Sequence, residues 1–116
     1  MSLDKNNAFV QENLFGGTGA VHIWNLLGRR TAPPFSAALW CELEPGGSVG
    51  PHVQQADAEV VIAVSGEGLA TAGGKTHHMG PGVLVHLPLG DTLALENTSE
   101  SIPLVYLILK STGAGV

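Results

Sequence analysis

Short hydrophobic segments alternate with glycine and proline along nearly the whole chain. Breakers such as Pro45-Gly46-Gly47 and Gly80-Pro81-Gly82 recur too often to leave room for a long helix. The segments between them are rich in β-branched and aromatic residues, which is typical of strands. We therefore predict strands at residues 20–27, 35–43, 59–64, 68–71, 75–78, 83–87, 92–96 and 102–109.

Two places in this pattern are more specific. Gly73-Gly74 separates two short segments, which predicts a tight hairpin turn with positive φ angles. The run at 102–109 has little polar alternation, so it predicts a strand covered on both faces, with a short buried helix as the alternative. Many short strands at this spacing predict an all-β sandwich or barrel.

The length of 116 residues allows one compact domain. We assign residues 16–116 to it and expect residues 1–15 to be loose or to contact another subunit. A hydrophobic content of 44% excludes intrinsic disorder, and the longest apolar run is too short to span a membrane. The N-terminus has no basic region followed by an apolar core, so we expect a cytoplasmic protein.

Charge and cysteine content exclude several classes of partner and site. The formal net charge is -5, and the few basic residues are scattered, which argues against nucleic acid and membrane surfaces as partners. The single cysteine, Cys41, lies in an apolar stretch, and we predict a buried thiol rather than a reactive one. One cysteine permits neither an intramolecular disulfide nor a cysteine-based metal cluster.

Candidate chemistry gathers between residues 52 and 59. In an extended strand His52 and Gln54 share a face, and Glu59 begins the returning strand, where it can face the same space. An imidazole, an amide and a carboxyl group therefore converge. His52 and Glu59 are the candidate catalytic acid–base pair, and the alternative is that they bond to each other and to Gln54 in a barrel that only binds a ligand.

The spacing of these residues resembles the first motif of the cupin family. Gly46, His52, Glu59 and Gly66 stand at its positions, and Gln54 stands where the family has its second histidine. The family's second motif is matched by Gly82, Pro88, Gly90 and Asn97, with Leu93 in place of its histidine. The resemblance implies a cupin-type double-stranded β-helix, which is a small jelly-roll barrel.

The resemblance also implies a divalent metal such as manganese, iron, nickel, copper or zinc. Gln54 is a poorer ligand than histidine, and Leu93 offers none, so a site of His52, Gln54 and Glu59 would bind weakly. His86 would join His52 and Glu59 if its apolar neighbours packed outward. The alternative for His86 is a histidine bonded to backbone or water.

The predicted pocket is apolar around this polar cluster. Alternation from Glu59 sends Val61 and Ala63 to the carboxylate's side, and Leu93 and Leu95 should line the facing strand. Such a composition is usual for small-molecule sites, and burial there should raise the pKa of Glu59.

Three functions remain open on the sequence alone. One is a small-molecule-binding barrel that needs no metal, and another is a metal-dependent cupin enzyme of the dioxygenase, isomerase or lyase class. The third is a structural role, in which the barrel is mainly a dimer-forming scaffold. The resemblance implies a homodimer, and residues 20–27 with Trp24 would supply an apolar sheet edge for it.

Overall fold

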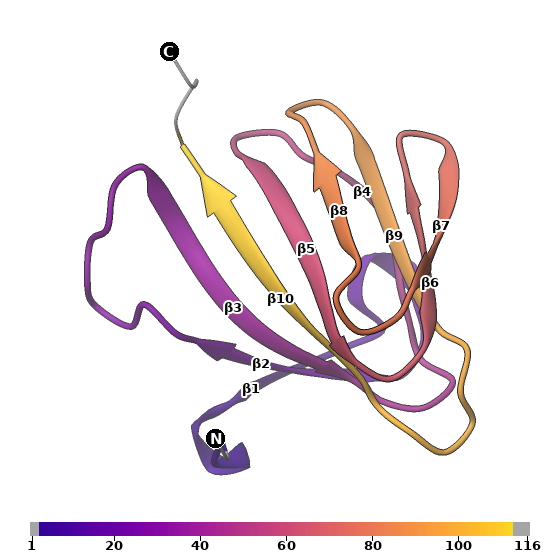
Figure 1. Cartoon of the computed structure of the whole chain (residues 1–116). Helices are drawn as coiled ribbons and strands as arrows, with labels where there is room; N and C mark the ends of the chain where they lie inside the picture. The colour runs from indigo at the N-terminus through magenta and orange to yellow at the C-terminus, as the bar shows by residue number, and fades with distance from the viewer. Residues whose placement is uncertain (1–2, 113–116) are drawn as a thin grey trace.

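The computed structural model describes residues 3–112 and shows two antiparallel sheets packed face to face (Figure 1). The strand order is β1-β2-β3-β10-β5-β8 in the six-stranded sheet and β4-β9-β6-β7 in the four-stranded sheet. The strands are β1 (Phe9–Glu12), β2 (Ala20–Asn25), β3 (Phe35–Leu43), β4 (Ser48–Val53), β5 (Ala58–Ser65), β6 (Gly68–Ala72), β7 (Lys75–Met79), β8 (Leu84–Leu87), β9 (Thr92–Asn97) and β10 (Leu104–Ser111). This confirms the predicted all-β jelly-roll architecture.

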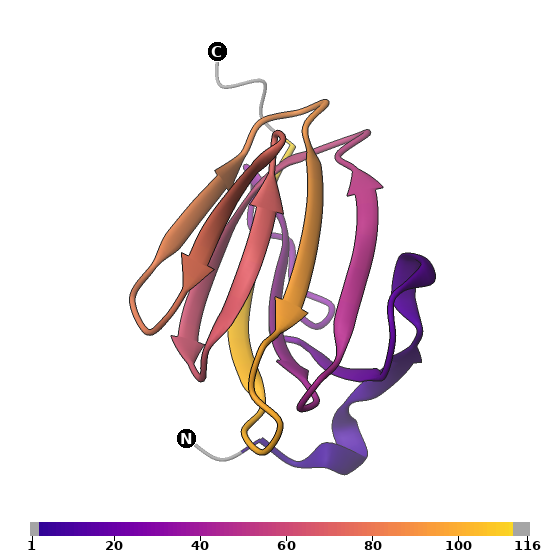
Figure 2. The ribbon, with the colours of Figure 1, turned by 90° about the vertical axis from the view of Figure 1, so that its right-hand side faces the viewer.

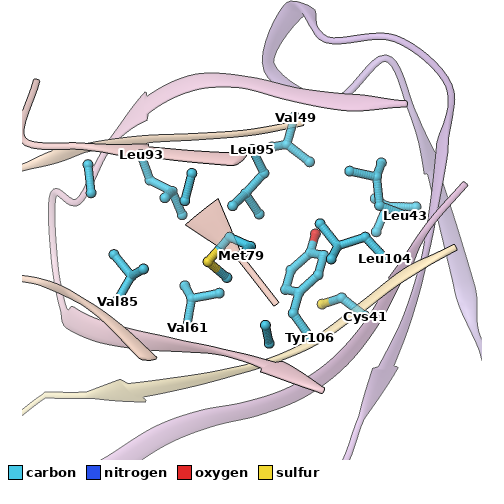
Figure 3. Packing of buried hydrophobic residues seen from close by; sticks show 14 of the residues in the cluster. Cys41, Leu43, Val49, Val61, Met79, Val85, Leu93, Leu95, Leu104 and Tyr106 are labelled. Atoms are coloured by element: carbon cyan, nitrogen blue, oxygen red, sulfur yellow. The ribbon is translucent and has the colours of Figure 1, made fainter. Parts of the chain in front are cut away.

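The hydrophobic core fills the space between the two sheets. Figure 2 shows the four-stranded sheet in front of the other, and Figure 3 shows side chains from both sheets pointing toward one another. Alternate residues of β5 and β9 are buried, because successive side chains of a strand point to opposite faces. No helix among residues 3–112 is long and apolar enough to cross a membrane.

All eight predicted segments contain a strand, including 102–109, which is β10 rather than a helix. Gly73 and Gly74 have φ angles of 57° and 80°, which confirms the hairpin turn between β6 and β7. The predicted ranges omit β1 and β4. The sequence of β4 contains Gly50-Pro51, which has the composition of a turn, although the strand continues through it.

The segment before residue 16 contains two short 3-10 helices, η1 (Lys5–Asn7) and η2 (Leu14–Gly16), on either side of β1. β1 pairs with β2, so the expectation that residues 20–27 form an exposed edge is wrong: β1 and β3 occupy both sides of β2. Trp24 is buried, and its Nε1 donates a 2.9 Å hydrogen bond to the Asp4 carbonyl oxygen. Contact of this segment with another subunit stays a prediction.

Asn97, at the end of β9, forms hydrogen bonds to two loops at one end of the barrel, the β3–β4 loop and the β9–β10 loop. Its side chain is buried, and Nδ2 lies 2.9–3.1 Å from the carbonyl oxygens of Leu43, Glu44 and Ile102. Its Oδ1 accepts a hydrogen bond from the Ser99 backbone N–H. The last residue of the second motif therefore satisfies backbone groups from two separate loops.

We predict that Asn97→Leu lowers the free energy of unfolding by at least about 1–3 kcal/mol, the cost of a buried polar group left without a partner. Urea unfolding followed by circular dichroism measures the change. The matched control is Asn7→Leu at an exposed position of η1, which should change stability little. Equal stability of the Asn97 variant and the parent protein would contradict this role.

Candidate functional site

A bulge in β4 turns the candidate site residues toward the inside of the barrel. The register of β4 against β9 shifts between Val49, which pairs with Leu95, and His52, which pairs with Leu93. The extra residue of the bulge places Val49 and His52 on the same inner face. Gln54 follows on that face and is 4% exposed, so it is a buried residue rather than a solvated one.

The second 3-10 helix covers this part of β4. An added Cβ at Gly50 would clash with the Phe15 carbonyl oxygen, so glycine allows the two backbones to approach closely. Phe15 has a left-handed backbone conformation with φ of 54°, and its ring stacks on His52 at a centroid distance of 4.1 Å. Phe15 therefore lies over His52 from outside, with 54% of its surface exposed.

His52 presents a hydrogen-bond acceptor. Its Nδ1 lies 3.1 Å from the Gly50 carbonyl oxygen, and because a carbonyl can only accept, Nδ1 carries the proton. Burial lowers the pKa of His52, and Lys110 lowers it further, while the bond to Gly50 partly offsets this. In the neutral ring Nε2 therefore keeps its lone pair.

Glu59 is a buried carboxyl group with incomplete pairing. It is 3% exposed, and its Oε2 has no hydrogen-bond partner among residues 3–112. Lys110 Nζ lies 3.9 Å from Oε1, which is within range of an ion pair but too long for a hydrogen bond. Burial raises the pKa of Glu59, while the positive charge of Lys110 and the hydrogen-bond donor of the neighbouring Gln54 amide reduce the rise. The carboxyl group therefore keeps its proton to higher pH than an ordinary glutamate.

Cys41 and Tyr106 face each other across β3 and β10 on the same inner face. Cys41 is a free, buried thiol, as predicted, and burial raises its pKa to about 12. Burial also raises the pKa of Tyr106. Both groups are therefore neutral near pH 7 and do not supply a nucleophilic thiolate or phenolate.

These side chains surround a cavity of about 140 Å³ between the sheets. Its wall is mostly apolar and contains the polar residues His52, Glu59 and Lys110 together with Cys41 and Tyr106. Outside it lies an open hollow of about 520 Å³ lined by residues 53–57 and by Pro51. Phe15, His52 and Lys110 border both spaces, and we call this boundary between the cavity and the outer hollow the passage.

The predicted apolar pocket residues divide into two groups. Leu93 and Leu95 line the cavity, and Figure 3 shows both side chains pointing into the space between the sheets. Val61 and Ala63 are buried on the inner face of β5, as alternation predicts, but belong to the packed core rather than to the cavity wall. An apolar side chain, Leu93, therefore lies in the cavity wall at the motif position where the cupin pattern has a histidine.

The remaining histidines lie away from the cavity. Val85 and Leu87 are buried, so the intervening His86 is on the outer face, where it is exposed opposite Val60. The condition under which His86 would join His52 and Glu59 is thus not met. His77 and His78 are exposed, and His78 pairs with Glu67 on the surface.

Another hollow, of about 550 Å³, is an open depression that borders β4, β6 and β9. Glu96 is its single titratable residue among those described. Titratable groups therefore gather at the smaller interior cavity and not there.

The donor set does not fit a transition metal. Within residues 3–112 no three side chains of the histidine, cysteine, aspartate and glutamate types come together as a metal site. Glu59 instead faces the ammonium group of Lys110, and Leu93 occupies the second motif's ligand position. One imidazole and one carboxylate leave most of a coordination shell unfilled.

Two residues at the site, Lys110 and Phe15, were not among those predicted from the sequence. Lys110 continues the inward alternation of Tyr106 and Ile108 in β10, so extending this period by one step would have found it. Phe15 has no comparable signal, because its position depends on contact between segments far apart in the sequence.

Comparison with known proteins gives a consistent fold. A family model described as a cupin domain matches residues 39–110. A predicted oxalate decarboxylase from Thermotoga maritima has 22% identity and a TM-score of 0.80, covering 96% of this chain and 98% of its own. A cupin 2 conserved barrel domain protein from Salinispora arenicola has 24% identity, a TM-score of 0.71, and coverage of 94% and 85%.

A polyketide cyclase from Streptomyces resistomycificus has 17% identity, a TM-score of 0.73, and coverage of 97% and 80%. The search of curated proteins gave no match. At these identities the solved structures establish the fold alone.

We predict that Glu59→Gln stabilises the protein near pH 7 by roughly 1 kcal/mol, since it removes a poorly paired buried charge. A raised carboxyl pKa means that the folded state holds the proton more tightly than the unfolded state. The parent protein therefore loses stability as pH rises from the ordinary glutamate pKa through the raised one. Urea unfolding at several pH values should show a difference between the proteins that vanishes toward low pH. A difference that grows at low pH would contradict the assignment.

Proposed function

Because this chain belongs to the cupin domain family, we propose that its barrel binds a small, mostly apolar molecule without needing a metal ion. The observation that carries the proposal is the interior cavity, whose apolar wall is interrupted only by a small polar cluster. This is the usual composition of a small-molecule site. The cavity of about 140 Å³ limits the buried part of the ligand. In another protein, an apolar cavity of about 150 Å³ binds benzene, so a single ring or a short branched chain is the right size.

The polar cluster would orient such a ligand. His52 offers the Nε2 lone pair, and Glu59 has an unused Oε2, so both can accept a hydrogen bond from a hydroxyl group. The hydrocarbon part would contact Leu93, Leu95 and Ile108 in the wall. A phenol has both parts and is a suitable probe.

The alternative is a metal-dependent enzyme of the dioxygenase, isomerase or lyase class. Similar structures described as a predicted oxalate decarboxylase and as a polyketide cyclase support this alternative. The unfavourable donor set described above supports the metal-free binding role instead.

We predict that phenol binds to the parent protein and that Leu93→Phe weakens binding at least about tenfold by filling the cavity. Protein NMR titration measures the affinity and shows whether cavity residues shift. Leu89→Phe, at an exposed position with the same change in size, should bind phenol like the parent protein.

Circular dichroism checks that both variants fold. If Leu93→Phe does not fold, Ile108→Phe tests the same wall at a less buried position. Phenol binding that both wall variants leave unchanged would contradict the cavity as the site. Stoichiometric manganese, iron, nickel, copper or zinc that is lost on His52→Ala would overturn the metal-free proposal.

A homodimer is the second part of the proposal, and the outer face of the six-stranded sheet supports it. Trp40 of β3, Leu107 of β10 and Ile62 of β5 are register partners, and each lies between two inward-facing residues. They therefore form an apolar row on the outside of the sheet. The outward positions of β3, β5 and β10 include one charged residue, Glu42, so two copies can meet there with little repulsion.

We predict that the parent protein is a dimer and that Trp40→Glu converts it to a monomer by placing a charge in this row. Size-exclusion chromatography with light scattering measures the mass. Val53→Glu introduces the same charge at an exposed position of β4 and should leave the dimer intact. A monomeric parent protein, or a Trp40 variant that remains dimeric, would refute the proposed interface.

A further inference from the structure

Lys110 is the one lysine or arginine among the described residues that line the cavity and the outer hollow. It lies at the passage between them, with 37% of its side chain exposed. The side chain therefore brings a positive charge to the point where a ligand would pass from solvent into the barrel. The distance of 3.9 Å to Glu59 Oε1 leaves the ammonium hydrogens without a hydrogen bond to that carboxylate.

Gln54 brings a second donor to the same side, next to the Glu59 carboxyl group. Its Nε2 is buried and has no hydrogen-bond partner among residues 3–112. Gln54 and Lys110 both line the outer hollow, beside His52. The Gln54 backbone is held in place by hydrogen bonds to Asp91 and Gly90, so the side chain starts from a fixed point. A buried amide N–H without a partner costs free energy, so a ligand that offers a hydrogen-bond acceptor there would be favoured.

Two acidic residues, Asp57 and Glu59, lie near the passage. Asp57 also lines the outer hollow, but its Oδ2 accepts a 2.6 Å hydrogen bond from Ser36 Oγ. Glu59 is the other carboxyl group, and burial shifts it toward its neutral form. Neutral His52 adds no charge of its own. Lys110 is therefore the positive charge at the passage, with the buried Glu59 as its ion-pair partner, and its ammonium hydrogens are free to bond to a ligand.

Resting on the proposed binding function, the geometry points to a carboxylic acid as the ligand class. Its carboxylate accepts hydrogen bonds from Lys110 Nζ and Gln54 Nε2 at the passage, and its hydrocarbon part enters the apolar cavity. Lys110 then acts as a specificity-determining residue that supplies, from the chain itself, a positive charge for an organic anion. Charge-assisted hydrogen bonds to a carboxylate are stronger than neutral ones, so the acid is preferred over a neutral molecule of the same shape.

The test compares benzoate with phenol, two ligands of similar ring size that differ in charge. NMR titrations use the parent protein, Lys110→Met, Lys110→Arg and, as a matched control, Lys75→Met at an exposed position of β7. We expect Lys110→Met to weaken benzoate roughly tenfold or more while changing phenol less than about twofold, because only the charge-assisted bond is lost. Lys110→Arg should retain most of the benzoate affinity, and Lys75→Met all of it.

A purely structural role of Lys110 would give a different pattern. If Lys110 only neutralises Glu59, Lys110→Met should weaken both ligands equally, and the added change Glu59→Gln should restore both. That pattern, or benzoate affinity unchanged in Lys110→Met, would overturn the inference. Phenol binding without benzoate binding in the parent protein would overturn it while leaving the proposed function intact. Failure of both ligands to bind would count against the proposed function itself.

Discussion

The irregular register of β4 against β9 is the constraint on which the site depends. In a regular strand Val49 and His52 would face opposite sides, and the imidazole would be lost from the barrel interior. The bulge at Gly50-Pro51 places both on the inner face. Gly50 also lets η2 approach β4, so the same local irregularity brings Phe15 onto His52. The same irregularity in β4 therefore positions both His52 in the cavity wall and Phe15 over it.

The electrostatics of the cavity differ from those of a metal centre. A transition metal needs several converging lone pairs, whereas the chain offers one imidazole, one buried carboxyl group and an ammonium group beside it. A second positive charge close to Lys110 would be repelled by it. In the proposed function the cation is part of the chain, and the open hydrogen-bonding positions of Gln54 and Glu59 are available to a ligand.

Much of the fold could be predicted from the sequence, because strand alternation and turn chemistry are local properties. The motif glycines Gly46, Gly66, Gly82 and Gly90 have φ values between 72° and 94°, which explains why glycine marks these turns so clearly. The predicted partners His52, Gln54 and Glu59 came from the same reasoning. Lys110 could have been found by alternation, but Phe15 could not, because it reaches His52 through a contact between η2 and β4, segments far apart in the sequence.

The sequence by itself determined eight of the ten strands, the β6–β7 turn and the inward face of β5, since these follow from residue type and a two-residue period. Tertiary structure decided which groups share one space. It placed His86 outside through the burial of Val85 and Leu87, and it brought Lys110 to Glu59 by pairing β10 with β5. Packing between distant segments sets the cavity's size and charge, and neither can be read from the order of residues along a strand.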